Sequence, residues 1–202
     1  MGATFEQGGT GVEFERLDAG MYPATCIHVV ELGTHDNTHP QAKPGTKKKD
    51  LLLVFETEEL MPENDEGKQL PYVLSLRCTN SLGERATLRK HLESWRGKAF
   101  TDDELINFSV DKVLGKPCIL NVTKEEKKGK TYNNIKGVNP LMKGMTVTDP
   151  VNEMIDFGIH DIETETFKKL WPWVQKIITA SYEAKELGLT LEPKEEEDDV
   201  PF

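Results

Sequence analysis

The order of the apolar segments along the chain constrains its fold most strongly. Residues 21–33, 50–59 and 72–82 are rich in β-branched, aromatic and aliphatic side chains and are separated by polar stretches that contain glycine and proline, which predicts three strands. In the third segment every second side chain belongs to one apolar set: Tyr72, Leu74, Leu76 and Cys78. This is the period of a strand with one buried face, so Arg77 should point away from the core.

The apolar period changes from that of a strand to that of a helix after Gly83. Leu88, Leu92 and Trp95 recur at intervals of four and three residues, and Gly97 follows as a stop signal. Thr101 with Glu104 three residues later is the capping-box signature of a second, short helix. Two further strands are then predicted, at residues 117–125 and 131–140, joined by the basic turn KKGK.

Five short strands with a helix between the third and the fourth follow the element order of the OB-fold, a small Greek-key β-barrel that commonly binds oligonucleotides. We therefore expect a mainly β chain, a β-barrel of the OB-fold type, over residues 1–150. Other five-stranded barrels and α+β sandwiches use the same elements, so the strand order alone leaves these alternatives open.

A C-terminal helical extension is predicted over residues 151–188. Its apolar residues have helical spacing: Phe167, Leu170, Trp171, Val174, Ile178 and Tyr182. Pro172 must start a new helix or kink one. Trp171 belongs to the apolar stripe, as Trp95 does in the earlier helix, so we expect both indoles to pack in the core rather than to stack on bases.

Charge is distributed unevenly along the chain. The net charge is −10, yet residues 40–145 hold 19 lysines and arginines against 15 aspartates and glutamates, whereas the flanks hold 6 against 20. A mildly basic centre with acidic ends fits a protein that contacts a polyanion with one surface, and chance asymmetry fits the numbers equally well.

No residue pattern predicts a catalytic, metal or cofactor site, and we expect a protein that is not an enzyme. Cys26, Cys78 and Cys118 lie far apart in apolar stretches, which favours buried free thiols. His35 and His39 fall in a proline-containing segment expected to be a solvated loop rather than a metal site. The chain has neither an apolar run long enough to span a membrane nor a secretory signal, so we expect a cytosolic protein.

Binding to single-stranded nucleic acid requires cations along the phosphates and flat side chains on which bases stack. If Ile135 faces the core, then Tyr132, Asn134 and Lys136 share the opposite face, and Asn121, Thr123 and Arg77 point the same way from other strands. We expect Tyr132 to stack on a base and the cations to contact phosphates. Two lysine-rich loops would add Lys43, Lys47, Lys48 and Lys49 after the first strand, and Lys124, Lys127, Lys128 and Lys130 in the last turn. The alternative is that these lysines are ordinary solvated residues that protect a sheet edge from aggregation.

The chain ends in a strongly acidic segment. Residues 189–202 lack an apolar period and are expected to be disordered. Glu195 to Asp199 are five consecutive carboxylates, and Val200, Pro201 and Phe202 follow them. Such a segment is either solvated and without a role or a binding segment for a partner.

The tip DDVPF resembles the acidic tip of bacterial single-stranded DNA-binding proteins, and some phage single-stranded DNA-binding proteins also end in an acidic tail with a terminal Phe. The segments LRKHLESWRGKAFTDDEL, LGKPC and YNNIKGV are similar to an OB-fold group of such phage proteins, over roughly residues 20–140. The chain differs from the bacterial proteins in one respect: a helix takes the place of the Gly/Gln/Pro-rich linker that precedes their tip. Tetramer formation therefore cannot be carried over.

The resemblance implies a protein that binds and protects single-stranded DNA during phage DNA replication, recombination or repair, in the cytoplasm of the host cell. It also implies that the tip, Asp198, Asp199, Val200, Pro201 and Phe202, docks on replication or recombination proteins. Phe202 would enter an apolar pocket, the aspartates would meet a basic rim, and the tail could compete with DNA. A strand-annealing recombination mediator and a protein-interaction module that does not bind DNA remain alternatives.

Overall fold

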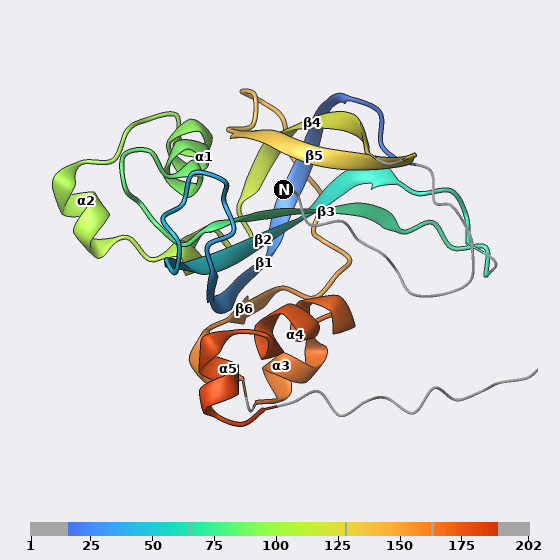
Figure 1. The fold of residues 1–202 in the computed structure, drawn as a ribbon. Coiled ribbons are helices and arrows are strands. Elements are labelled where there is room, and N and C mark those ends of the chain that lie inside the picture. Colours follow the sequence, from blue (N-terminus) through green and yellow to red (C-terminus); the bar gives the residue numbers. More distant parts are fainter. Residues whose placement is uncertain (1–15, 65, 128, 163, 190–202) are drawn as a thin grey trace, which may run out of the picture.

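The computed structural model describes residues 16–64, 66–127, 129–162 and 164–189 and shows a mainly β chain with short helices. The strands are β1 (Gly20–Asp36), β2 (Lys47–Leu60), β3 (Pro71–Thr79), β4 (Pro117–Lys127), β5 (Lys130–Asn139) and β6 (Ile155–Phe157). Hydrogen bonds join them in the antiparallel order β3-β2-β1-β4-β5, and β6 pairs with β1 in parallel (Figure 1). All five predicted strands are confirmed.

Strand β1 is the centre of the sheet because it pairs with three other strands. Its first residues pair with β4, from Gly20 opposite Val122 onward, and the rest of the strand pairs with β2 as far as Asp36 opposite Lys47. The register with β2 shifts between Cys26 and His28 and again further along, and such bulges bend a strand. Cα atoms of β3 and β5 come within 8 Å of one another, although hydrogen bonding does not close the sheet across the described parts of these strands.

The β1–β2 part of the sheet is buried on both faces. Leu51, Leu53 and Phe55 pack on one side against α1 (Thr87–Arg96), whereas Leu52 and Val54 pack on the other side beneath the C-terminal segments. A strand covered on both faces carries a continuous apolar run rather than an alternation. This explains the uninterrupted sequence LLLVF in β2.

Capping residues explain where the helices between β3 and β4 begin or end. Helix α1 buries Leu88, Leu92 and Trp95, as predicted, and ends at Gly97, whose φ of 67° lies in the left-handed region. Helix α2 (Asp102–Asn107) starts with the predicted capping box, in which the Glu104 amide donates to Thr101 Oγ1 over 3.3 Å. The short 3₁₀ helix η1 (Val110–Val113) leads into β4.

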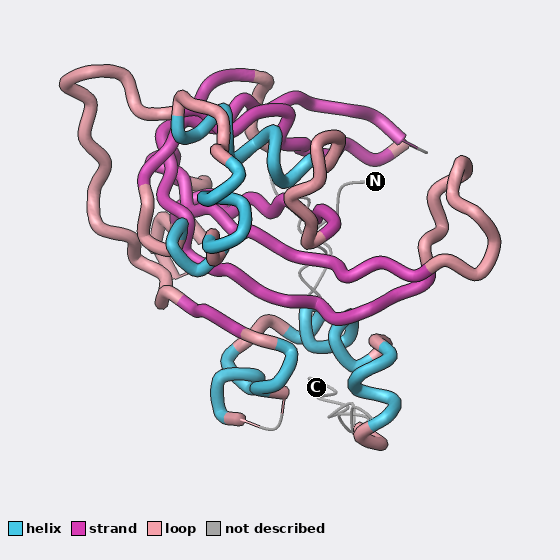
Figure 2. Tube along the Cα trace, turned by 90° about the vertical axis from the view of Figure 1, so that its left-hand side faces the viewer, coloured by secondary structure: helices cyan, strands magenta, loops and turns pink. Residues whose placement is uncertain are grey.

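The C-terminal extension is a series of short elements rather than one helix. After β6 come η2 (Ile159–Asp161), α3 (Glu165–Lys169), α4 (Pro172–Thr179) and α5 (Tyr182–Glu186). Pro172 starts α4, which is one of the two outcomes predicted for it, and Ser181 Oγ accepts a hydrogen bond from the Ala184 amide and caps α5. Figures 1 and 2 show these helices gathered on one side of the sheet, away from α1 and α2.

Side chains from the sheet fix the extension in place. The Glu56 carboxylate accepts hydrogen bonds from the amides of Val151 and Asn152 over 2.7 and 2.8 Å. The ring of Trp171 is partly buried and lies 4.5 Å from that of the buried His28, so this indole packs against the core. The segments before and after residue 150 therefore share an apolar cluster and a sheet.

Candidate nucleic-acid interface

The outward face of the β4–β5 hairpin presents the residues that alternation predicts. Val122 and Ile135 are buried opposite each other, so Thr123, Glu125, Asn134 and Tyr132 lie on the other face, with Tyr132 directly across from Glu125. Tyr132 and Asn134 are half-buried, and Lys136 is exposed. The sheet face therefore offers an aromatic ring, an amide and a cation.

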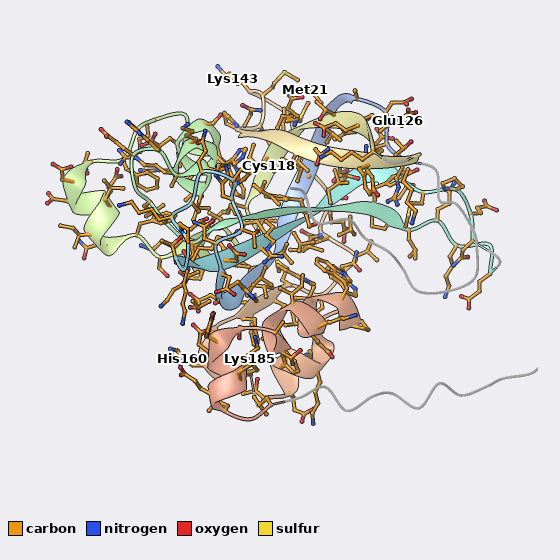
Figure 3. The ribbon with its side chains drawn as sticks, viewed as in Figure 1. Met21, Cys118, Glu126, Lys143, His160 and Lys185 are labelled. Carbon is orange, nitrogen blue, oxygen red and sulfur yellow. The ribbon has the colours of Figure 1, made fainter. Side chains whose placement is uncertain are left out.

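A β-bulge sets the position of Lys136 on this hairpin. Asn121 pairs with Gly137 and the next residue, Val122, pairs with Ile135, so Lys136 is the extra residue of β5. Met21 of β1 pairs with Asn121 and is exposed, so it adds an apolar side chain beside the hairpin. Figure 3 shows Met21 and Glu126 on this same side of the molecule.

Carboxylates pair with the cations of the hairpin. Lys136 Nζ donates to Glu125 Oε1 over 2.7 Å, and this hydrogen bond holds the pKa of the Glu125 carboxyl below its usual range. Lys127 Nζ lies 3.8 Å from the other oxygen of Glu125, and Lys124 lies 2.9 Å from Asp18. These pairs lie at the surface, where an ion pair contributes only about 0–1 kcal/mol.

Arg77 lies on the outer face of β3, as predicted, but its guanidinium is engaged. Nε and Nη2 donate to Asp50 Oδ2 over 3.0 and 2.6 Å, and Lys48 Nζ lies 3.1 Å from Oδ1. The Asp50 side chain is fully buried, whereas that of Arg77 is 27% exposed. A buried carboxylate requires such partners, so the first role of Arg77 is to compensate the charge of Asp50.

The prediction of two lysine-rich loops is wrong for most of these lysines. Lys47, Lys48 and Lys49 belong to β2, opposite Asp36, His35 and Thr34, because the β1–β2 ladder continues to the ends of both strands. Lys124 and Lys127 belong to β4, and Lys130 begins β5. Lys43 lies in the β1–β2 connection. Lys128 and the tip residues Asp198, Asp199, Val200, Pro201 and Phe202 lie outside the described residues.

The two groups of lysines lie at opposite ends of β1. Lys47 pairs with Asp36 at the end of this strand, whereas β4 pairs with its beginning and then continues past Gly20 to Lys127. Figure 1 shows the β1–β2 connection and the β4–β5 turn on different sides of the fold. The two groups of lysines are therefore not neighbours on the surface.

Lys47 and Lys49 differ from the paired cations described above. Both are exposed, and neither has a carboxylate oxygen within 4.0 Å in the part of the chain that the structure describes. The ammonium of Lys47 instead lies 3.4 Å from the centre of the Tyr182 ring on α5. Reasoning from the sequence placed Tyr182 on an apolar helical stripe and missed this contact, for which the sequence carries no local signal.

The described residues contain no group of three or more His, Cys, Asp or Glu side chains placed to hold a metal ion. All three cysteines are buried free thiols, as predicted, and burial raises the pKa of the Cys78 thiol to about 12. At neutral pH this thiol is protonated and a poor nucleophile.

Comparison with known proteins does not assign the chain. No protein-family model matches it, and no curated protein matches it. Among the described helices none is long and apolar enough to cross a membrane.

Proposed function

We propose that this protein binds single-stranded DNA, without acting as an enzyme, and coats exposed strands with little sequence preference during phage DNA replication, recombination or repair. The observation that carries the proposal is the outward face of β4–β5, where Tyr132, Asn134 and Lys136 lie together. A base can stack on any aromatic face regardless of its identity, and each such stack typically contributes about 1–3 kcal/mol.

The strand order supports a fold of the OB type. The order β3-β2-β1-β4-β5, with α1 and α2 between β3 and β4 and with β3 approaching β5, suits a five-stranded Greek-key barrel. In such barrels the outer face of the second and third strands commonly contacts the ligand. Here Leu52 and Val54 of β2 lie buried under the C-terminal extension. We therefore assign the DNA to the β4–β5 face, where Asn121 and Lys136 are exposed.

The ion pairs of this face are compatible with phosphate binding. Glu125 holds Lys127 and Lys136 at the surface, and pairs of this kind are weak. A phosphate can take the place of the carboxylate, and the counterions released from DNA then make the affinity fall as salt rises. Glu125 would keep these lysines in position while no DNA is bound.

The acidic tail would serve partner recruitment. The five carboxylates of Glu195 to Asp199 would compete with DNA for the lysines. The apolar end, Val200, Pro201 and Phe202, would insert into a pocket on a replication or recombination protein. Both parts of the tail can be changed independently. We place this activity in the cytoplasm of the host cell.

The proposal is tested by equilibrium binding of fluorescently labelled oligonucleotides at one low salt concentration. We expect a single-stranded dT oligonucleotide to bind and the corresponding duplex to bind much more weakly, because the bases of a duplex are not available to stack on Tyr132. Equal binding of both, or tighter binding of the duplex, would contradict the proposal.

A protein-interaction module that does not bind DNA is the second candidate. It is favoured by the local pairing of cations, since Arg77 and Lys48 share Asp50 while Lys127 and Lys136 share Glu125. For this candidate the single-stranded oligonucleotide would remain unbound at low salt, whereas a tail-dependent protein partner would still bind.

A further inference from the structure

The β1–β2 end of the sheet is joined to α5 through one aromatic ring. Tyr182 lies under Lys47, whose Nζ is 3.4 Å from the ring centre, and Lys185 Nζ lies 5.5 Å from the same centre. The Tyr182 hydroxyl donates to Asp36 Oδ1 over 2.7 Å, which raises the pKa of Tyr182. Figure 3 shows Lys185 on the side of the molecule occupied by the C-terminal helices, far from the β4–β5 hairpin.

Helix α5 is fixed firmly enough to hold this ring in place. The Glu183 carboxylate accepts from the Thr34 amide and hydroxyl over 2.7 and 2.6 Å. Gly33, at a φ of 83°, lets the helix approach β1 so closely that a Cβ atom there would lie 2.6 Å from Ser181 Cβ. The position of Tyr182 is therefore set by contacts on both sides of its own residue.

A ring and a carboxylate have different effects on the lysine that they hold. A carboxylate neutralises the ammonium locally, as Glu125 does for Lys136. An aromatic face attracts the ammonium through its quadrupole without cancelling the charge. Asp36 and Glu183, the carboxylates beside this site, accept hydrogen bonds from Tyr182 and Thr34. Among the described residues neither of them lies within 4.0 Å of the Lys47 ammonium, which is exposed above the ring.

We infer that α5 is part of the nucleic-acid interface, with Tyr182 as a positioning residue that holds the Lys47 ammonium ready for a phosphate of single-stranded DNA. Lys49 and Lys185 extend the same cationic surface. This inference rests on the proposed function and adds a second contact region at the far end of β1. Proteins of this type commonly cover about 4–16 nucleotides per OB-fold, so one strand can reach more than one region.

A double-mutant cycle on DNA binding tests this inference. Full-length wild type, Lys47→Gln, Tyr182→Leu and the double variant are titrated with fluorescent oligo-dT over a salt series. We expect each single change to weaken binding by on the order of fivefold and to lower the slope of log K against log salt by about one. The double variant should lose no more than either single variant, because both changes remove the same phosphate contact.

The control is Lys168→Gln, which removes one exposed positive charge from the same extension at a distance from Tyr182. Circular dichroism checks that Tyr182→Leu keeps its helices, and Lys47→Gln tests the contact without altering α5. Unchanged affinity and slope in Lys47→Gln, or fully additive losses in the double variant, would overturn the inference while leaving DNA binding by wild type intact. Absence of binding by wild type would overturn both this inference and the proposed function.

Discussion

The guanidinium of Arg77 lies 2.6 Å from a carboxylate oxygen of Asp50 whose side chain is completely buried. Strands β2 and β3 bring these residues together across a separation of 27 positions in sequence. Because Arg77 compensates the charge of this buried carboxylate, we expect substitution of Arg77 to change the stability first.

We predict that Arg77→Gln lowers the free energy of unfolding by about 1.5–3 kcal/mol, since it removes charged hydrogen bonds from a buried carboxylate. Lys136→Gln, at a surface pair, should change it by about 0–1 kcal/mol. Urea denaturation of the two variants measures both values. Equal stability of Arg77→Gln and wild type would show that Asp50 does not depend on Arg77.

Because α5 approaches β1 closely at Gly33, we expect substitution of a glycine by alanine to lower the stability more at this position than elsewhere. Gly33 and Gly45 both have positive φ, at 83° and 75°, but a Cβ atom would meet Ser181 only at Gly33 and would meet nothing within 4 Å at Gly45. Both substitutions incur backbone strain. We expect Gly33→Ala to lower the free energy of unfolding by about 1–3 kcal/mol more than Gly45→Ala, through overpacking. Equal losses in chemical denaturation would argue against the tight docking of α5.

Burial of His28 predicts a loss of stability in mild acid. Desolvation lowers the pKa of His28, although the Glu153 carbonyl, 3.2 Å from its Nε2, opposes this effect. An unfolded histidine titrates near pH 6.5. Between that pH and the lower folded pKa the unfolded state binds more protons, so the free energy of unfolding falls as the pH is lowered.

His28→Phe keeps an aromatic ring against Trp171 and removes the titration. Unfolding measured at several pH values between about 7.5 and 5 should show a shallower pH dependence in this variant than in wild type. Some dependence will remain, because burial also lowers the pKa of His91. Identical slopes in both proteins would mean that His28 is not desolvated in the folded state.

We expect substitution of Tyr132 by alanine to lower the DNA affinity without a matching loss of stability. Its ring is half-buried on the outward face of β5, so Tyr132→Ala should weaken binding of oligo-dT by about 1–3 kcal/mol, or roughly 5- to 150-fold. Tyr132→Phe keeps the stacking surface and should retain most of the affinity. If both variants bind like wild type, the bases do not stack on this ring.

Local sequence signals predicted the elements, whereas pairings between distant residues decided the site. The capping box of Thr101 and Glu104 could be predicted because it depends on neighbouring residues, and Pro172 could be assigned either to a helix start or to a kink. The strand position of Lys47–Lys49 could not, because it depends on pairing with residues 34–36. A three-residue strand such as β6 gives no periodicity to read, and it exists because it pairs with β1.

The ion pairs of the candidate interface also depend on distant residues and could not be predicted from local sequence. Alternation placed Tyr132, Asn134 and Lys136 on one face, but nothing in the sequence indicates that Glu125 holds Lys136 or that Asp50 holds Arg77. No pattern in the sequence indicates that the C-terminal extension covers β2. Ser181, in contrast, is a typical N-cap residue, and this signal would have divided the predicted C-terminal helix into shorter helices.

The most direct test of DNA binding is a fluorescence titration of the full-length wild-type protein with poly-dT over a series of salt concentrations. Tight binding at low salt is predicted, with log K falling linearly as log salt rises and a slope that reflects the number of phosphates neutralised. Absence of a signal at low salt, or an affinity that does not change with salt, would contradict single-stranded DNA binding by this protein.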